Sequence, residues 1–67
     1  MTYTWNETGN RHIMELNGER KWFVTRGRDG WLVYETVQDN KAYLRCRARS
    51  LDNAKRKAYQ AAIRRIA

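Results

Sequence analysis

Arginine alternates with small or apolar residues in the segment 42–49, and this pattern suits contact with a charged partner better than any other in the chain. In a β-strand, successive side chains point to opposite faces, so alternate residues share one face. The polar set in this segment is Tyr43, Arg45, Arg47 and Arg49. Guanidinium groups form paired hydrogen bonds with phosphate or with guanine. The spacing therefore predicts that this strand binds a nucleic acid or another polyanion.

Side chains able to catalyse a reaction or hold a metal are few. The chain has one histidine, His12, and one cysteine, Cys46, which falls on the apolar face of the arginine strand. One His and one Cys are too few for a tetrahedral zinc site, and no nucleophile–base–acid set can be assembled. A buried cysteine most often serves as a small hydrophobe. We therefore expect a non-enzymatic protein with no catalytic residues, no metal and no cofactor.

Charge is unevenly distributed along the 67 residues, whose net charge is +7. Residues 1–40 carry five Lys/Arg and six Asp/Glu, whereas residues 41–67 carry nine and one, so the last segment has +8 from nine minus one. Such asymmetry is typical of proteins that contact nucleic acid, although a basic surface can also serve solubility alone. The single cysteine cannot form an internal disulfide, which favours the reducing cytoplasm. No apolar run reaches bilayer length, and we expect neither a signal peptide nor a membrane partner.

The elements that must position the arginine strand are read from alternation and from turn residues. Asn17-Gly18 is the strongest hairpin signal, since a type I′ turn needs positive φ at both central residues. We expect one small domain, residues 1–67, with strands at about 2–7, 11–16, 20–26, 31–37 and 41–49 and a helix at about 51–66. The expected fold class is α+β: an antiparallel β-meander of three to five strands, followed by one C-terminal helix packed on one sheet face.

A two-residue loop at 39–40 would set the register of the last hairpin. It places Val33 opposite Cys46, Tyr34 opposite Arg45 and Thr36 opposite Tyr43. One face of the sheet is then apolar, with Glu35 as its one charged residue. The apolar members of that face are Trp22, Val24, Trp31, Val33, Val37, Ala42, Leu44, Cys46 and Ala48. The opposite face carries Lys21, Phe23, Thr25, Leu32, Tyr34, Tyr43, Arg45, Arg47 and Arg49.

The C-terminal helix has a start signal and a narrow apolar face. Ser50 suits the N-cap, and Asp52 in the first turn complements the positive end of the helix dipole. The apolar face is mostly alanine and consists of Leu51, Ala54, Ala58, Ala61, Ala62 and Ile66. Such a face lets the helix lie close to a sheet whose tryptophan side chains fill the space. We expect the stems of Lys55 and Arg65 to run along it with their charged ends in water.

Two groups of residues form the predicted binding surface. Those expected to contact the nucleic acid from the sheet face are Phe23, Tyr34, Tyr43, Arg45, Arg47 and Arg49. Those expected to hold phosphates are Arg26, Arg28, Lys55, Arg56 and Lys57. Aromatic rings can stack on bases, and a sheet face can enter the major groove of DNA. We therefore expect a nucleic-acid partner, DNA rather than RNA, bound by a monomer or a weak homodimer.

Two other interpretations of the same face remain open. In the first, the arginines and Tyr34 form ordinary cross-strand pairs on a solvated face. In the second, the aromatic residues and their arginine rim bind a protein, because Tyr and Arg are enriched at interface hot spots.

A meander that leads into Ser-Leu-Asp-Asn-Ala-Lys at 50–55 and an alanine-rich helix resembles two groups of DNA-binding domains. These are AP2-type domains and the N-terminal domains of phage and transposon integrases, which combine a three-stranded sheet with a helix. The resemblance covers about residues 20–66 and implies DNA contact by the exposed sheet face. It places that contact on Phe23, Thr25, Leu32, Tyr34, Tyr43, Arg45 and Arg47. The first hairpin, residues 1–16, departs from the pattern.

The chain is also similar in style to small stand-alone phage proteins, some of which bind host proteins. This resemblance implies an alternative function, that of an inhibitor or adaptor. Such a protein would bind a host nucleic-acid-processing complex through the aromatic and arginine residues of the sheet face.

Overall fold

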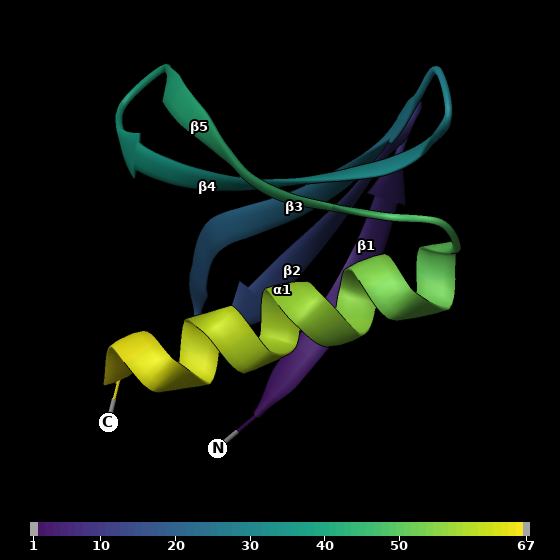
Figure 1. Cartoon of the computed structure of the whole chain (residues 1–67). Coiled ribbons are helices and arrows are strands. Elements are labelled where there is room, and N and C mark those ends of the chain that lie inside the picture. The colour runs from purple at the N-terminus through teal and green to yellow at the C-terminus, as the bar shows by residue number, and fades with distance from the viewer. Residues whose placement is uncertain (1, 67) are drawn as a thin grey trace.

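The computed structural model describes residues 2–66, with only the backbone of Ile66, and it shows one sheet and one helix. The elements in chain order are β1 (Tyr3–Thr8), β2 (Arg11–Leu16), β3 (Glu19–Gly27), β4 (Gly30–Gln38), β5 (Lys41–Ala48) and α1 (Leu51–Ile66). The five strands lie in sequence order and pair antiparallel, and α1 packs across one face of the sheet (Figure 1). This confirms the α+β class and the meander followed by a single helix.

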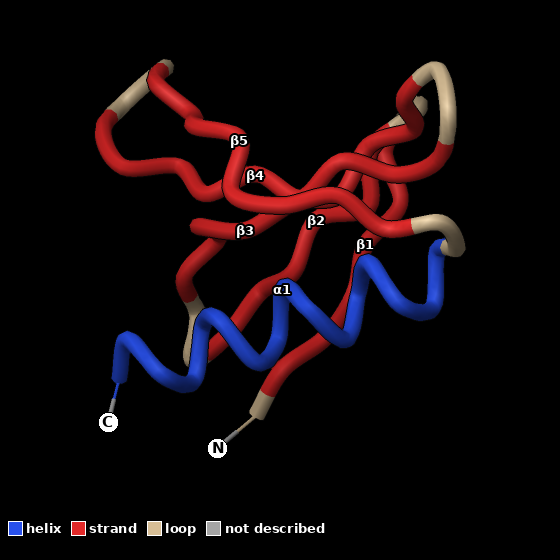
Figure 2. The backbone as a smooth tube through the Cα atoms, viewed as in Figure 1, coloured by secondary structure: helices blue, strands red, loops and turns tan. Residues whose placement is uncertain are grey.

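Short turns join the strands, as the tan segments in Figure 2 show. Asn17 and Gly18 have φ values of 53° and 81°, which is the pair of positive angles that a type I′ turn requires. Asn40, in the turn before β5, also has positive φ, at 65°. β3 and β4 each extend one residue beyond both ends of the expected ranges 20–26 and 31–37.

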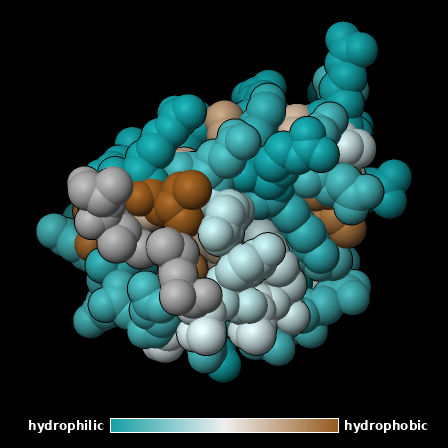
Figure 3. Space-filling view, turned by 90° about the horizontal axis from the view of Figure 1, so that it is seen from below, coloured by the Kyte–Doolittle hydropathy of each residue, from teal (hydrophilic) through white to brown (hydrophobic). Residues whose placement is uncertain are grey.

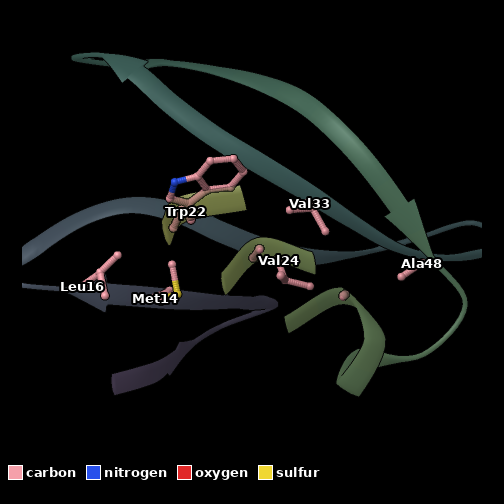
Figure 4. Packing of buried hydrophobic residues seen from close by; sticks show 9 residues of the cluster. Met14, Leu16, Trp22, Val24, Val33 and Ala48 are labelled. Atoms are coloured by element: carbon pink, nitrogen blue, oxygen red, sulfur yellow. The ribbon is translucent and has the colours of Figure 1, made fainter. Parts of the chain in front are cut away.

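The core lies between α1 and the sheet face that we call the inner face. Met14, Val24 and Val33 are almost fully buried there, with 1%, 0% and 0% of their surface exposed (Figure 4). From the helix, Ala54, Ala58 and Ala62 face them and are at most 2% exposed. Each fully buried Val or Met contributes roughly 1.5–3 kcal/mol to folding. The expected alanine face of the helix is confirmed, except at Ile66, whose side chain lies outside the described residues.

Half of the predicted register of the last hairpin is wrong. Val33 does pair with Cys46, as expected. Beyond that point, however, Tyr34 pairs with Leu44 and Glu35 with Tyr43, because a β-bulge leaves Arg45 as an extra residue in β5. A one-residue shift moves side chains to the other face, so part of β5 is turned over relative to the expected arrangement.

The bulge changes which side chains are buried. Leu44, expected on the apolar face, is 41% exposed. Val37, also expected there, is 51% exposed and lies at a second irregularity of the hairpin, between Thr36 and Gln38. Tyr43 and Arg45, expected on the opposite face, instead lie on the inner side together with Glu35.

A buried carboxylate is the physical reason for this correction. Glu35 is 8% exposed, and one of its oxygens, Oε1, accepts hydrogen bonds from two guanidinium groups. Arg45 Nε donates at 2.9 Å and Arg65 Nη2 donates at 3.0 Å. A charge removed from water needs such partners, and the bulge brings Arg45 within reach. The guanidinium group of Arg65 therefore forms an ion pair with Glu35 and is not simply surrounded by water.

Hydrophilic and intermediate side chains cover most of the face seen from the helix side, where hydrophobic residues appear only in small areas (Figure 3). Among the described residues, no helix has the length and apolar character needed to cross a membrane.

Candidate nucleic-acid interface

Four basic side chains converge where the β3–β4 turn, the end of β5 and the first half of α1 meet. We call this group the basic end; its members are Arg28, Arg47, Arg49 and Lys57. Two adjoining hollows of about 400 and 180 Å³ open here, and Arg47 lines both. Asp29 is the one carboxylate among the residues that line them. The four cations and one anion leave a formal charge of +3 at a concave surface, which is suited to an anion.

The geometry of the basic end follows from local structure. Gly30 has φ +147°, and a Cβ placed on it would lie 2.5 Å from the carbonyl oxygen of Ala48, so glycine lets the turn pack against β5. Ser50 Oγ accepts a hydrogen bond from the Asn53 amide at 3.2 Å and caps α1, as expected. Lys57, two turns into the helix, donates from Nζ to the carbonyl oxygen of Arg47 at 2.9 Å. That bond uses one of the three ammonium protons and leaves two for a ligand.

Within the described residues, the cations of the basic end have no carboxylate partner. Within the described part of the chain, ion pairs engage only Arg20, Lys21, Arg45 and Arg65 among the basic residues. Arg28, Arg47, Arg49 and Lys57 are all exposed. Their charges are therefore available to a phosphate without first breaking an internal ion pair.

The sheet face opposite α1, here called the outer face, carries a row of apolar side chains. Ile13, Phe23, Tyr34 and Leu44 are paired in succession across β2, β3, β4 and β5. The Phe23 and Tyr34 rings stack with centroids 5.1 Å apart and planes at 10°. The Arg11 guanidinium lies 4.7 Å from the Phe23 centroid. Arg11 comes from β2 and Tyr34 from β4, and these strands flank β3 on opposite sides. The two groups therefore cover both faces of the Phe23 ring, so a base has no free ring face there.

The residues predicted for the site do not form one surface. Arg28, Arg47, Arg49 and Lys57 come together, and Phe23 and Tyr34 adjoin on the outer face. The remaining predicted residues lie elsewhere or stand alone: Tyr43, Arg45, Arg26, Lys55 and Arg56.

Each separated residue has its own surroundings. On the inner side, Arg45 donates a hydrogen bond to Glu35, and its guanidinium carbon Cζ lies 5.7 Å from the Tyr43 ring centroid. Arg26 pairs with Trp31 in the register and so shares the inner side. The Lys55 Nζ lies 5.2 Å from the ring centroid of Trp5 in β1, and Lys55 is half-buried. Arg56 is an exposed residue of α1.

Sequence reasoning missed two basic residues, Arg11 on the outer face and Lys41 at the start of β5. They line a further hollow of about 390 Å³ together with Phe23, Thr36, Asn40 and Ala42. The alternation of residues 11–16 leaves open which set of side chains points outward, so Arg11 could not be assigned to a face. The pairing of Ile13 with Phe23 settles it.

The groups considered for catalysis remain isolated from one another. His12 packs edge-on against Trp31 with centroids 5.6 Å apart, and Cys46 is a half-buried free thiol beside the core. Over residues 2–66, no three His, Cys, Asp or Glu side chains gather as a metal site would require.

Comparison of the chain with protein-family models, with curated proteins and with solved structures finds no match. The resemblance to AP2-type and integrase domains therefore remains an expectation from the sequence, and the interface is interpreted from its own chemistry.

Proposed function

We propose that this chain is a non-enzymatic nucleic-acid-binding protein, with DNA as its ligand, that holds the phosphate backbone at the basic end. The observation that carries the proposal is the convergence of Arg28, Arg47, Arg49 and Lys57 from three separate elements around one concave surface. Backbone phosphates are spaced so that several cations on one surface can be used together, and each contact releases condensed counterions.

The surrounding charge supports this function. The chain has a net charge of +7, and seven of the nine cations in residues 41–67 form no ion pair with any other residue that the structure describes. Arginine predominates at the basic end, and its planar fork matches phosphate oxygens in pairs. Arg47 lies at the border with the outer face, where it pairs with Leu32, so a bound backbone can continue over the sheet.

The salt dependence of binding tests the function directly. We expect fluorescence anisotropy to show binding to a labelled duplex, with a log–log salt slope of about −3.6 if all four cations meet phosphates at −0.9 each. Arg47→Gln combined with Arg49→Gln should make that slope shallower by about 1.8. The matched control is Arg64→Gln, which removes an exposed α1 cation outside the basic end. Absence of binding to any duplex or single strand at low salt would refute nucleic-acid binding.

A protein-binding role is the second candidate, and the apolar row of the outer face favours it. Phe23 and Tyr34 use their ring faces on each other and on Arg11, as in a packed patch rather than a base-stacking platform. The role expected here is that of an inhibitor or adaptor of a host nucleic-acid-processing complex.

Capture of a partner from nuclease-treated bacterial lysate separates the two functions. Under the protein-binding role, the Lys57→Gln variant retains one partner and the Tyr34→Ala variant loses it. Under nucleic-acid binding, capture disappears with nuclease treatment.

A further inference from the structure

The outer face holds a second concave site, separate from the basic end. We call it the outer hollow; its volume is about 390 Å³ and its lining is Arg11, Phe23, Thr36, Asn40, Lys41 and Ala42. None of these residues lines the two hollows of the basic end. The strands β2, β3, β4 and β5 and the β4–β5 turn all contribute to it, so the site exists only in the folded chain.

The charge of the outer hollow is wholly positive. Arg11 and Lys41 are exposed, and neither forms an ion pair within the described residues. A hollow of similar size, about 370 Å³, lies beside the last turns of α1, but Glu19 and Glu35 line it along with two cations. A phosphate would meet carboxylates there, whereas in the outer hollow it meets cations alone.

The neutral side chains of the outer hollow suit the rest of a nucleotide. Phe23 provides an apolar wall that Arg11 and Tyr34 hold in place from its two sides. The Thr36 hydroxyl and the Asn40 amide can each donate and accept a hydrogen bond, as the edge of an unpaired base requires. Cations for a phosphate, an apolar wall and two hydrogen-bonding groups thus lie within one small volume.

We propose that the outer hollow binds one unpaired nucleotide, so that the nucleic acid held by this chain is engaged as a single strand. This inference rests on the proposed function and adds the class of ligand. In a duplex the bases are stacked and paired, and bringing one into a separate pocket costs the energy of unstacking and unpairing. A single strand has no such cost, and its backbone extends from the basic end over the outer face to Arg11 and Lys41.

The experiment compares two labelled probes, an oligothymidylate of about ten nucleotides and a duplex of the same length. Ten nucleotides lie within the ~4–16 that one single-strand-binding fold usually covers. One phosphate contact to a single strand contributes about 0.7 to the log–log salt slope. The loss of oligothymidylate affinity caused by Arg11→Gln, or by Lys41→Gln, should therefore be about fivefold larger at 0.1 M salt than at 1 M salt. Binding of the duplex should stay unchanged. Arg64→Gln, which removes one cation outside the outer hollow, should change neither.

A variant without a charge change tests the base contact. Thr36→Val should weaken binding of oligothymidylate but not of an abasic strand of the same length. Circular dichroism of each variant checks that the fold is kept.

The outcomes separate the two levels of inference. If Arg11→Gln and Lys41→Gln behave like Arg64→Gln, or if the duplex binds as tightly as the single strand, the outer hollow is not a nucleotide site. Nucleic-acid binding at the basic end can still hold in that case, and the Arg47→Gln and Arg49→Gln pair shows it. If the wild type binds neither probe, both inferences fail.

Discussion

Replacement of Glu35 by alanine should destabilise the fold far more than the same change at Glu15. Both carboxylates accept a hydrogen bond from an arginine Nε at 2.9 Å, so the two pairs match in geometry. They differ in burial, because the Glu35 side chain is 10% exposed and the Glu15 side chain is 34% exposed. Glu35 also has a second partner in Arg65, whereas among the described residues Glu15 pairs with Arg20 alone.

The magnitude follows from the exposure of each partner. The Arg45 side chain is 39% exposed, so its bond to Glu35 lies near the low end for a charged hydrogen bond, about 1.5 kcal/mol. Arg65 is 61% exposed, which places its bond among surface pairs at about 0.5 kcal/mol. Glu35→Ala should therefore cost about 2 kcal/mol, and Glu15→Ala about 0.5 kcal/mol or less. In a domain of this size, 2 kcal/mol lowers Tm by about 8–16 °C.

Urea unfolding followed by tryptophan fluorescence measures both variants. The midpoint should fall for Glu35→Ala with an unchanged m-value, because the surface exposed on unfolding stays the same. Double-mutant cycles with Arg45→Ala and Arg65→Ala divide the effect, and coupling to Arg45 should be the larger. Equal losses for Glu35→Ala and Glu15→Ala, or zero coupling to Arg45, would show that the buried carboxylate does not hold the bulge.

Three further substitutions test the packing around α1 and the basic end. Gly30→Ala should lower the free energy of unfolding by about 2 kcal/mol or more, since its Cβ would meet the Ala48 carbonyl at a strained φ; a wild-type melting curve would contradict this. Ser50→Ala should cost about 1 kcal/mol in urea titration by removing the N-cap, and a change under 0.3 would argue against the cap. Ala58→Leu should cost about 1–3 kcal/mol by thermal melting, because Ala58 is fully buried against the sheet, and an unaltered Tm would mean that the helix shifts freely.

Local sequence signals were sufficient for the elements of this fold. Alternation and the Asn17-Gly18 turn placed the strands, and Ser50 with the alanine face placed the helix. These signals depend on neighbours in the chain, which is why they can be read without a structure.

The bulge in β5 could not be predicted in the same way. Glu35 accepts hydrogen bonds from Arg45, the bulge residue, and from Arg65, which is thirty residues further along the chain, so no local pattern records the full set of contacts. The wrong faces predicted for Tyr43 and Arg45 follow from the one-residue shift in register at Arg45. Glu35 was the signal available, because a lone charge on an apolar face demands a partner.

The sequence predicts only part of the candidate site, because some of its residues are brought together by contacts between distant segments. Arg47 lies before the end of β5 on the part of the strand where the register was right, and it does lie near Arg28 and Lys57. Arg11 and Lys41 were missed because the strands and turn that bring them together are distant in sequence. Only the folded sheet shows that they share a hollow.

The two edges of the sheet differ in how well they resist strand addition. β5 pairs with β4 through two irregularities and carries Lys41, Arg45 and Arg47, and both bulges and basic residues discourage another strand from docking. β1, at the opposite edge, pairs with β2 in an uninterrupted register and has one charged residue, Glu7. Self-association of concentrated protein should therefore begin at β1, and Asn6→Lys should suppress it in analytical ultracentrifugation while the basic end stays free.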